Sequence, residues 1–442
     1  MIIKDENANK SMKLNFSALI LSFIGSGILG VAVSYGNLYL FHIILIFISF
    51  MSLYKIKKKS FKFNFKILTS KYVRSFLIII AWYAISLLWA PSLELGLKYI
   101  FYLFCGISLI ISIVYLGKSL SHLNRIYRVA SFFIFIEIII ALLESFTAFR
   151  MPISSYSKLA THFGKDPINY SAFDNIYNLT RISPPTGFHW NTNDLALCMA
   201  ISLPFFLCCK NNLIKLCGPI IITLIVIMTA SRAVFMGLIL IFFLYLFAIK
   251  KKLGTLMVVC ILSSTFFFSI SFLKENENPR INELANSLEA ATLYLTGEID
   301  VSGSLKWRRE LTENGLLAFS RTYGLGLGAG GSVANQEKIG PVAGRFTSMH
   351  NFWIEILVEG GVVAAAIIIS LITSMIYNLF IISRKIVDSD MKYYSESLFL
   401  SLFGLIPSAI ASSSTVYFFP MWIIFGFSIS VISLSKKVNN MI

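Results

Sequence analysis

Three short stretches place charged or titratable side chains directly beside long apolar runs. His350 stands in "TSMHNFWIEI" and Arg232 in "TASRAVF", each at the border of such a run. Arg308 and Arg309 stand together in "SLKWRRELTENG". A neutral histidine accepts protons near neutral pH, and a guanidinium offers phosphate oxygens a rigid fork of N–H donors. These residue types favour a transfer in which a phosphate group leaves while a hydroxyl loses its proton.

Each of these residues also has a purely structural interpretation. Arg232 could extend to lipid phosphates at a membrane surface, as long basic side chains do. Arg308 and Arg309 could lie on a solvated helix face, paired with the neighbouring glutamates. His350 could be a satisfied polar residue where a helix begins. The chemical interpretation gains weight because the topology derived below puts all three stretches on one side of a membrane.

Asn351 and Glu355 follow the histidine and could support it. Asn351 could orient the imidazole ring, or it could cap the helix that begins there. Glu355 could orient His350 or pair with an arginine. A carboxylate that enters an apolar run is costly, so Glu355 should face protein or water.

A second polar strip, "PPTGFHWNTND", combines aromatic and amide side chains. His189, Trp190 and Asn193 are candidate substrate ligands, since rings stack on sugar faces and amides bond to hydroxyls. Trp190 could equally be an interfacial residue, and Asn193 or Asp194 a helix cap.

The glycine-rich stretch "GLGLGAGG" (324–331) imitates a nucleotide-binding fingerprint. A true fingerprint follows a strand and opens a helix in a βαβ unit, whereas this one follows a helical pattern. We expect a tight turn whose backbone N–H groups approach a ligand.

The composition indicates a membrane protein. Of 442 residues, 56% are hydrophobic and 14% charged, and the mean hydropathy is +0.75. The net charge of +16 comes from basic clusters between apolar runs, which fix membrane topology, so nucleic-acid binding is not expected. The 6 cysteines lack the spacing and histidine partners of a metal site. Two glutamates within an apolar run, Glu137 and Glu144, remain unassigned.

Apolar runs long enough to cross a membrane predict an all-α fold with about twelve transmembrane helices. The expected spans are 14–34, 37–54, 72–90, 97–117, 127–148, 194–210, 213–230, 233–249, 253–273, 352–383, 395–414 and 416–435. Basic residues gather in alternate links, which puts both termini in the cytoplasm.

The spans and links divide the chain into five parts. These are 1–148 with spans one to five, 149–193 as a first long outer loop, 194–273 with spans six to nine, 274–350 as a large outer loop, and 351–442 with spans ten to twelve. The large loop should be partly helical, at 278–297 and again at 304–324. Long polar loops on one face usually carry function.

The motifs resemble those of the O-antigen polymerase and ligase family of polytopic glycan-transfer enzymes. "GFHWNTNDLA", "TASRAVFMGL" and "GLGLGAGG…MHNFWIEILVEGGVVAAA" carry the resemblance, over roughly residues 180–370. In the family, a glycine-rich stretch of the outer loop precedes a His-Asn pair that opens the next helix. Trp307 precedes Arg308 here, whereas relatives often have a tryptophan after the loop arginine, so Arg308 and Arg309 both stay candidates.

The resemblance implies a metal-independent, inverting glycosyltransferase without a cofactor. His350 would be the catalytic base, and Arg232 with Arg308 or Arg309 would hold the pyrophosphate. The donor would be a glycan on undecaprenyl pyrophosphate, and the acceptor a second glycan. The enzyme would lie in the bacterial inner (cytoplasmic) membrane with its active site on the periplasmic or outer face.

Alternatives remain open within and outside this family. A polymerase would extend the chain, and a ligase would pass it to an acceptor such as lipid A-core. A chain-length regulator is a possible partner of a polymerase. A flippase for lipid-linked sugars would instead need polar residues through the middle of the membrane, whereas the candidates here gather on one face.

Overall fold

The computed structural model describes residues 2–57, 68, 70–167, 184–251, 304–342, 347–412 and 415–439. The helices of the first half are α1 (Ile2–Leu29), η1 (Gly30–Ala32), α2 (Leu40–Lys57), α3 (Lys71–Ser86), α4 (Leu93–Leu116), α5 (Leu120–Phe146), η3 (Lys158–Phe163) and α7 (Thr192–Leu207). Those of the second half are α8 (Asn212–Thr229), α9 (Arg232–Leu244), η5 (Tyr245–Ile249), α12 (Ser304–Ser320), α13 (Gly331–Ile339), α14 (Phe352–Lys385), α15 (Ser389–Ser408), η7 (Thr415–Tyr417) and α16 (Phe419–Asn439). The short strands β1 (Ser34–Tyr35) and β2 (Leu38–Tyr39) pair antiparallel between α1 and α2.

The described residues confirm the expected helical membrane protein. Helices satisfy every backbone polar group internally, which is what an apolar chain in lipid requires. Every expected span within the described residues overlaps a helix. In the part of the chain that the structure describes, six helices are long and apolar enough to cross a membrane, namely α4, α5, α8, α9 with η5, α14 and α16. The total of twelve stays a prediction, as do the five parts of the chain and the cytoplasmic placement of the termini, and the ninth span (253–273) lies outside the described residues.

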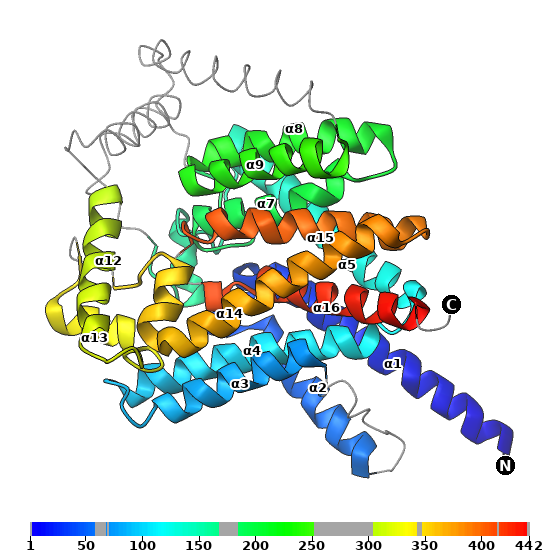
Figure 1. Ribbon diagram of the computed structural model, residues 1–442, viewed down its shortest axis with the longest axis horizontal. Helices are drawn as coiled ribbons and strands as arrows, with labels where there is room; N and C mark the ends of the chain where they lie inside the picture. Colours follow the sequence, from blue (N-terminus) through cyan, green and yellow to red (C-terminus); the bar gives the residue numbers. More distant parts are fainter. Residues whose placement is uncertain are drawn as a thin grey trace.

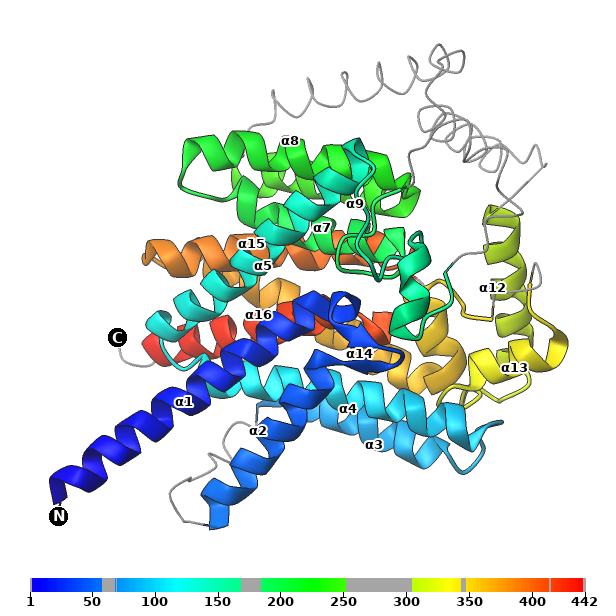
Figure 2. The same cartoon turned by 180° about the vertical axis from the view of Figure 1, so that it is seen from behind.

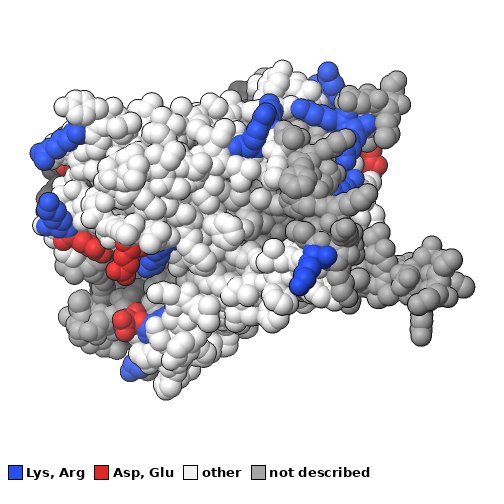
Figure 3. Space-filling model, turned by 90° about the horizontal axis from the view of Figure 1, so that it is seen from below, with Lys and Arg blue, Asp and Glu red and all other residues white. Residues whose placement is uncertain are grey.

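The long helices form a bundle whose two ends differ (Figures 1 and 2). At one end, here called the α12 end, α12 and α13 lie beyond the bundle, whereas the start of α1 and the end of α16 lie at the opposite end. Inside, α16 packs against α4, and α15 packs against α7, α9 and α14. In Figure 3 the charged side chains lie mainly toward the two ends of the visible face, which suits a bundle whose middle is in lipid.

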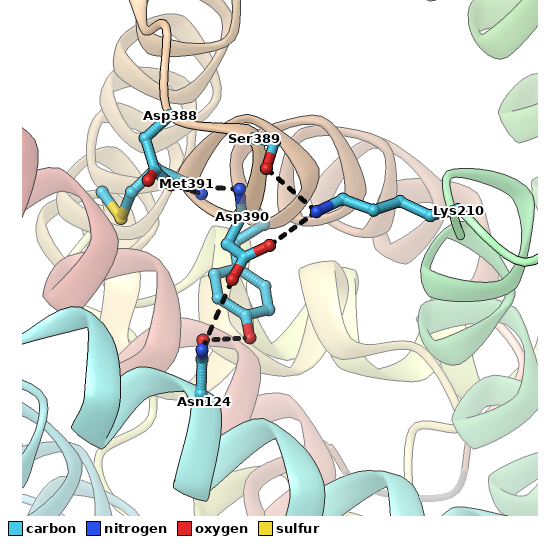
Figure 4. A network of polar contacts seen from close by, with 7 residues as sticks. Asn124, Lys210, Asp388, Ser389, Asp390 and Met391 are labelled. Carbon is cyan, nitrogen blue, oxygen red and sulfur yellow. Dashed lines mark hydrogen bonds and ion pairs between the residues drawn. The ribbon is translucent and has the colours of Figure 1, made fainter.

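A polar network fastens the helices at the end opposite α12 (Figure 4). Lys210, in the link between α7 and α8, forms an ion pair of 2.7 Å with Asp390 of α15. Asn124 of α5 donates a 3.4 Å hydrogen bond to the other oxygen of Asp390, and Tyr394 donates one of 2.7 Å to Asn124. Three separate parts of the chain are thereby joined near the surface.

Two features of the outer loop differ from the sequence prediction. The expected helix at 304–324 is present as α12 but ends at Ser320. Tyr323 has a left-handed backbone with φ of 52°, a conformation that ends a helix. The expected helix at 278–297 lies outside the described residues.

The glycine-rich stretch packs onto a break in α14. Gly361 interrupts that helix with φ of 70° and ψ of −170°, a conformation that essentially only glycine adopts. Leu327 N–H donates to Val358 O at 2.7 Å, and Val362 N–H donates to Gly324 O at 2.9 Å. The expectation that these N–H groups approach a ligand is therefore wrong for Leu327, because the helix carbonyls that the break exposes need donors of their own.

Candidate active site

The local fold at the start of α14 holds His350 in a defined position. Asn351 caps the helix, since its side-chain oxygen accepts a hydrogen bond of 3.1 Å from Trp353 N–H. The next residue, Phe352, donates its N–H to Ala409 O at the end of α15, at 3.2 Å. His350 itself has a left-handed backbone with φ of 49°, which is uncommon outside glycine and costs free energy.

Arg308 extends from α12 to the C-terminal end of α15, which Phe352 also contacts. Its Nη2 donates to Ala411 O, just beyond the end of α15, at 3.3 Å. Burial and the charge of Arg232 lower the pKa of Arg308 to about 10, so the guanidinium stays charged at neutral pH. Arg232 is the first residue of α9, and α9 packs along α15. Two guanidinium groups from different segments therefore share one region at the α12 end.

His350 is neutral in this environment. Burial and the charge of Arg308 lower the pKa of His350 to about 4. At neutral pH the imidazole consequently has a lone pair available to accept a proton. The structure brings Arg232, Arg308 and His350 together from three separate segments, as their common side of the membrane suggested.

Arg309 is oriented differently from Arg308. Its Nε forms a 2.6 Å ion pair with Glu313, one turn along α12, and both side chains are at least half exposed. This matches the solvated-face interpretation for Arg309. The geometry thus favours Arg308 over Arg309 as the arginine near His350.

Glu355 is buried one turn into α14, so it faces protein, as expected of a carboxylate in an apolar run. The charge identified as acting on His350 is that of Arg308. The expectation that Glu355 orients His350 or pairs with an arginine stays a prediction.

The residues of the second polar strip separate in the structure. His189 and Trp190 line a pocket of about 440 Å³, together with Asp194. Asn191 caps α7 by accepting a hydrogen bond of 2.9 Å from Asn193 N–H. The expected cap at Asn193 or Asp194 is therefore wrong, and Asn193 is not among the residues that line the pocket.

His189 belongs to a buried cluster that the sequence analysis missed. Its Nε2 lies 2.9 Å from one carboxylate oxygen of Glu137, and the Cys198 thiol donates to the other at 3.3 Å. Burial disfavours the charged imidazole, but Glu137 outweighs it, and the pKa of His189 is raised. The three donor atoms lie within 4.8 Å of one another and are types that zinc accepts, although here they bond to each other. A glutamate within an apolar run was the available signal.

Glu144 explains how the loop that carries His189 is held. Its Oε2 accepts hydrogen bonds from Thr186 N–H at 2.7 Å and from Gly187 N–H at 2.8 Å. A buried carboxylate that receives two backbone donors is well stabilised. This glutamate, like Glu137, therefore fixes the entry to α7.

Comparison with known proteins agrees with the geometry. Residues 218–369 match the family model described as O-antigen ligase. The teichuronic acid biosynthesis protein TuaE of Bacillus subtilis (strain 168) is 24% identical over 366 residues, which are 81% of this chain and 70% of the relative. The resemblance to the O-antigen polymerase and ligase family is confirmed.

These matches support a role in surface-polysaccharide biosynthesis for this membrane protein. The matched range contains Arg232, Arg308 and His350, and it includes the break in α14 at Gly361. It ends before α15, whose end accepts the hydrogen bonds from Phe352 and Arg308. The candidate site accordingly depends on contacts beyond the matched segment.

Proposed function

We propose that the protein is a polymerase of a surface polysaccharide that moves a glycan from undecaprenyl pyrophosphate to an acceptor sugar hydroxyl. The reaction would take place on the outer face of the cytoplasmic membrane. The observation that carries the proposal is the convergence of two arginines and a neutral histidine at the α12 end. The name of the relative, a teichuronic acid biosynthesis protein, supports a biosynthetic role.

The proposed reaction is a single displacement at the anomeric carbon of the donor sugar. The acceptor hydroxyl oxygen forms the new glycosidic bond, and its proton passes to His350. The bond to the pyrophosphate oxygen breaks, and the leaving group takes the electron pair. Arg232 and Arg308 stabilise the negative charge that grows there, and the anomeric configuration inverts.

The low pKa of His350 keeps the imidazole neutral before the anionic donor binds. Without donor, the neighbouring guanidinium keeps the imidazole neutral and ready to accept a proton. When two phosphates bind beside Arg308, their negative charge offsets the guanidinium and raises the basicity of His350. Donor binding thereby strengthens the base at the moment when it is needed.

Purified protein supplied with lipid-linked repeat units tests the proposal. A polymerase lengthens the glycan, and replacement of His350 by alanine at equal protein level abolishes the lengthening. A protein that only moves the lipid-linked glycan across a bilayer, without changing its length, would be a flippase. Full polymerase activity in the alanine variant would remove His350 from the mechanism.

A ligase is the second candidate, because the matched family model is described as O-antigen ligase. The donor site would be the same in both enzymes, so the acceptor decides between them. A strain that lacks the gene separates the two reactions. Single lipid-linked repeat units accumulate when a polymerase is lost, whereas long unattached chains accumulate when a ligase is lost.

A further inference from the structure

An open pocket of about 440 Å³ has His189 and Trp190 in its lining. It is bounded by the link between α1 and α2, by α4, by the start of α7 and by the residues that lead into α16. Its lining combines aromatic rings with charged groups of both signs, among them Tyr39, Tyr102, Trp190, Lys98, Asp166 and Asp194.

Two glycines form the rim of this pocket by bringing separate loops into contact. Gly36, between β1 and β2, has φ of 53°, and Gly164, at the end of η3, has φ of 67°. Gly36 N–H donates to Phe163 O at 2.7 Å. A Cβ atom at Gly164 would lie 3.3 Å from the Gly36 nitrogen, closer than such contacts usually are. The close approach leaves the backbone of both loops at the pocket mouth.

Lys165 fixes two of the rings. Its Nζ donates to Gly36 O at 2.8 Å and lies 5.3 Å from the ring centre of Tyr39 and 5.5 Å from that of Trp190. Cations at such distances are attracted to aromatic faces. Burial lowers the pKa of this lysine. One partly buried cation therefore holds both rings in place before any ligand enters, which reduces the entropy cost of binding.

One segment of the chain contributes both to the lining of the pocket and to the surroundings of Arg308. Tyr417 and Phe418 line the pocket and follow closely after Ala411, the residue that accepts the hydrogen bond from Arg308. The ring centres of Tyr417 and Tyr102 are 4.0 Å apart, and those of Phe418 and His189 are 5.5 Å apart. The pocket lining is therefore connected through this segment to the residue that Arg308 contacts.

We propose that this pocket binds a sugar residue of the acceptor glycan. Aromatic rings pack against the C–H faces of a pyranose, while carboxylates and ammonium groups bond to its hydroxyls. Two lysines and two aspartates line the pocket, so a pyrophosphate would meet repulsion as well as attraction, whereas a neutral polyhydroxylated ligand uses both charges. The assignment to the acceptor rests on the proposed function, which gives the donor to the arginines.

Binding of a free oligosaccharide tests the proposal separately from catalysis. The probe is the repeat-unit oligosaccharide released by mild acid from the surface polysaccharide of the source bacterium, without lipid or phosphate. Titration of the full-length protein in detergent should show binding, and Trp190→Ala should weaken it about tenfold or more. His350→Ala should bind the oligosaccharide like the unchanged protein. Tyr323→Asn, at a fully exposed residue whose left-handed backbone asparagine tolerates, is the matched control and should also bind normally.

Other outcomes would overturn the assignment. Failure of the unchanged protein to bind the oligosaccharide, or equal binding by Trp190→Ala, would exclude a saccharide site there. Displacement of the oligosaccharide by inorganic pyrophosphate would identify a phosphate site instead. If Trp190→Ala does not fold, Trp190→Phe keeps a smaller ring and should raise the KM for the acceptor with little change in kcat. Binding without any glycan transfer would leave the sugar site standing and refute the proposed function.

Discussion

The backbone of His350 is under strain at the point where the chemistry is proposed. A left-handed conformation costs a non-glycine residue roughly 1–3 kcal/mol and persists only where surrounding contacts impose it. Those contacts are the cap by Asn351 and the hydrogen bond from Phe352 to Ala409. The strain places the imidazole beside Arg308, and burial keeps it neutral.

His350→Asn should separate this backbone conformation from the imidazole. Asparagine tolerates the left-handed region, so the thermal stability of the variant in detergent should be close to that of the unchanged protein. Loss of the proton acceptor should lower kcat by about 100-fold or more. Asn351→Ser, which keeps a capping oxygen, is the control and should retain most activity. Near-normal turnover by His350→Asn would assign proton transfer to another group.

The pH dependence of activity should change when the positive charge of Arg308 is removed, because this charge lowers the pKa of His350. The neutral imidazole is the active form, so activity falls as the pH drops through the pKa of His350, which is about 4. Arg308→Gln removes a neighbouring positive charge, which raises that pKa and shifts the acid limb of the kcat/KM profile to higher pH. Arg309→Gln removes the same charge from an exposed residue paired with Glu313 and should leave the limb in place. An identical shift in both variants would contradict the proposed geometry.

At the scale of elements, the break in α14 and the glycine-rich stretch form one unit. A Cβ at Gly326 would lie 2.4 Å from Glu359 O, and one at Gly361 would lie 2.4 Å from Gly324 O. Two backbones approach so closely that side chains are excluded from both. The loop that follows α12 is thereby fixed to the helix that begins beside His350.

Gly326→Ala should destabilise this unit by about 1–3 kcal/mol, because the added carbon meets backbone that cannot move without breaking the loop's contacts with α14. The measurement is thermal unfolding in detergent. Gly27→Ala is the control, since a Cβ there meets neighbouring side chains only at 3.5 Å and beyond, which is ordinary contact. Equal stability of the two variants would show that the loop adapts freely.

At the scale of the molecule, the two ends of the bundle carry different groups of polar residues. The end opposite α12 is fastened by the network around Lys210 and Asp390, and the α12 end holds the candidate site and the pocket. The topology predicted from basic residues places the α12 end outside the cell membrane. In the proposed reaction, this placement would give the site access to lipid-linked glycans on the outer face.

Single cysteines can test this orientation. In a background without the native cysteines, Tyr323→Cys at the α12 end should react with a membrane-impermeant maleimide added to intact spheroplasts. Val387→Cys, in the link between α14 and α15, should react only after the membrane is opened. Both side chains are almost fully exposed, at 100% and 95%, so protein burial does not explain a difference. The reverse pattern would invert the topology.

The sequence alone predicted the membrane helices, their approximate positions and the resemblance to a family of glycan-transfer enzymes, because apolar length, basic links and short motifs are local properties of the chain. It also singled out His350 and the arginines by their residue types. Only the tertiary structure favoured Arg308 over Arg309, since adjacent residues of a helix project about 100° apart and can face a buried and an exposed direction. Likewise, only the structure joined His189 to Glu137 and Cys198 and directed the N–H groups of the glycine-rich stretch to α14. Those contacts join residues far apart in the chain, and no local pattern encodes such pairs.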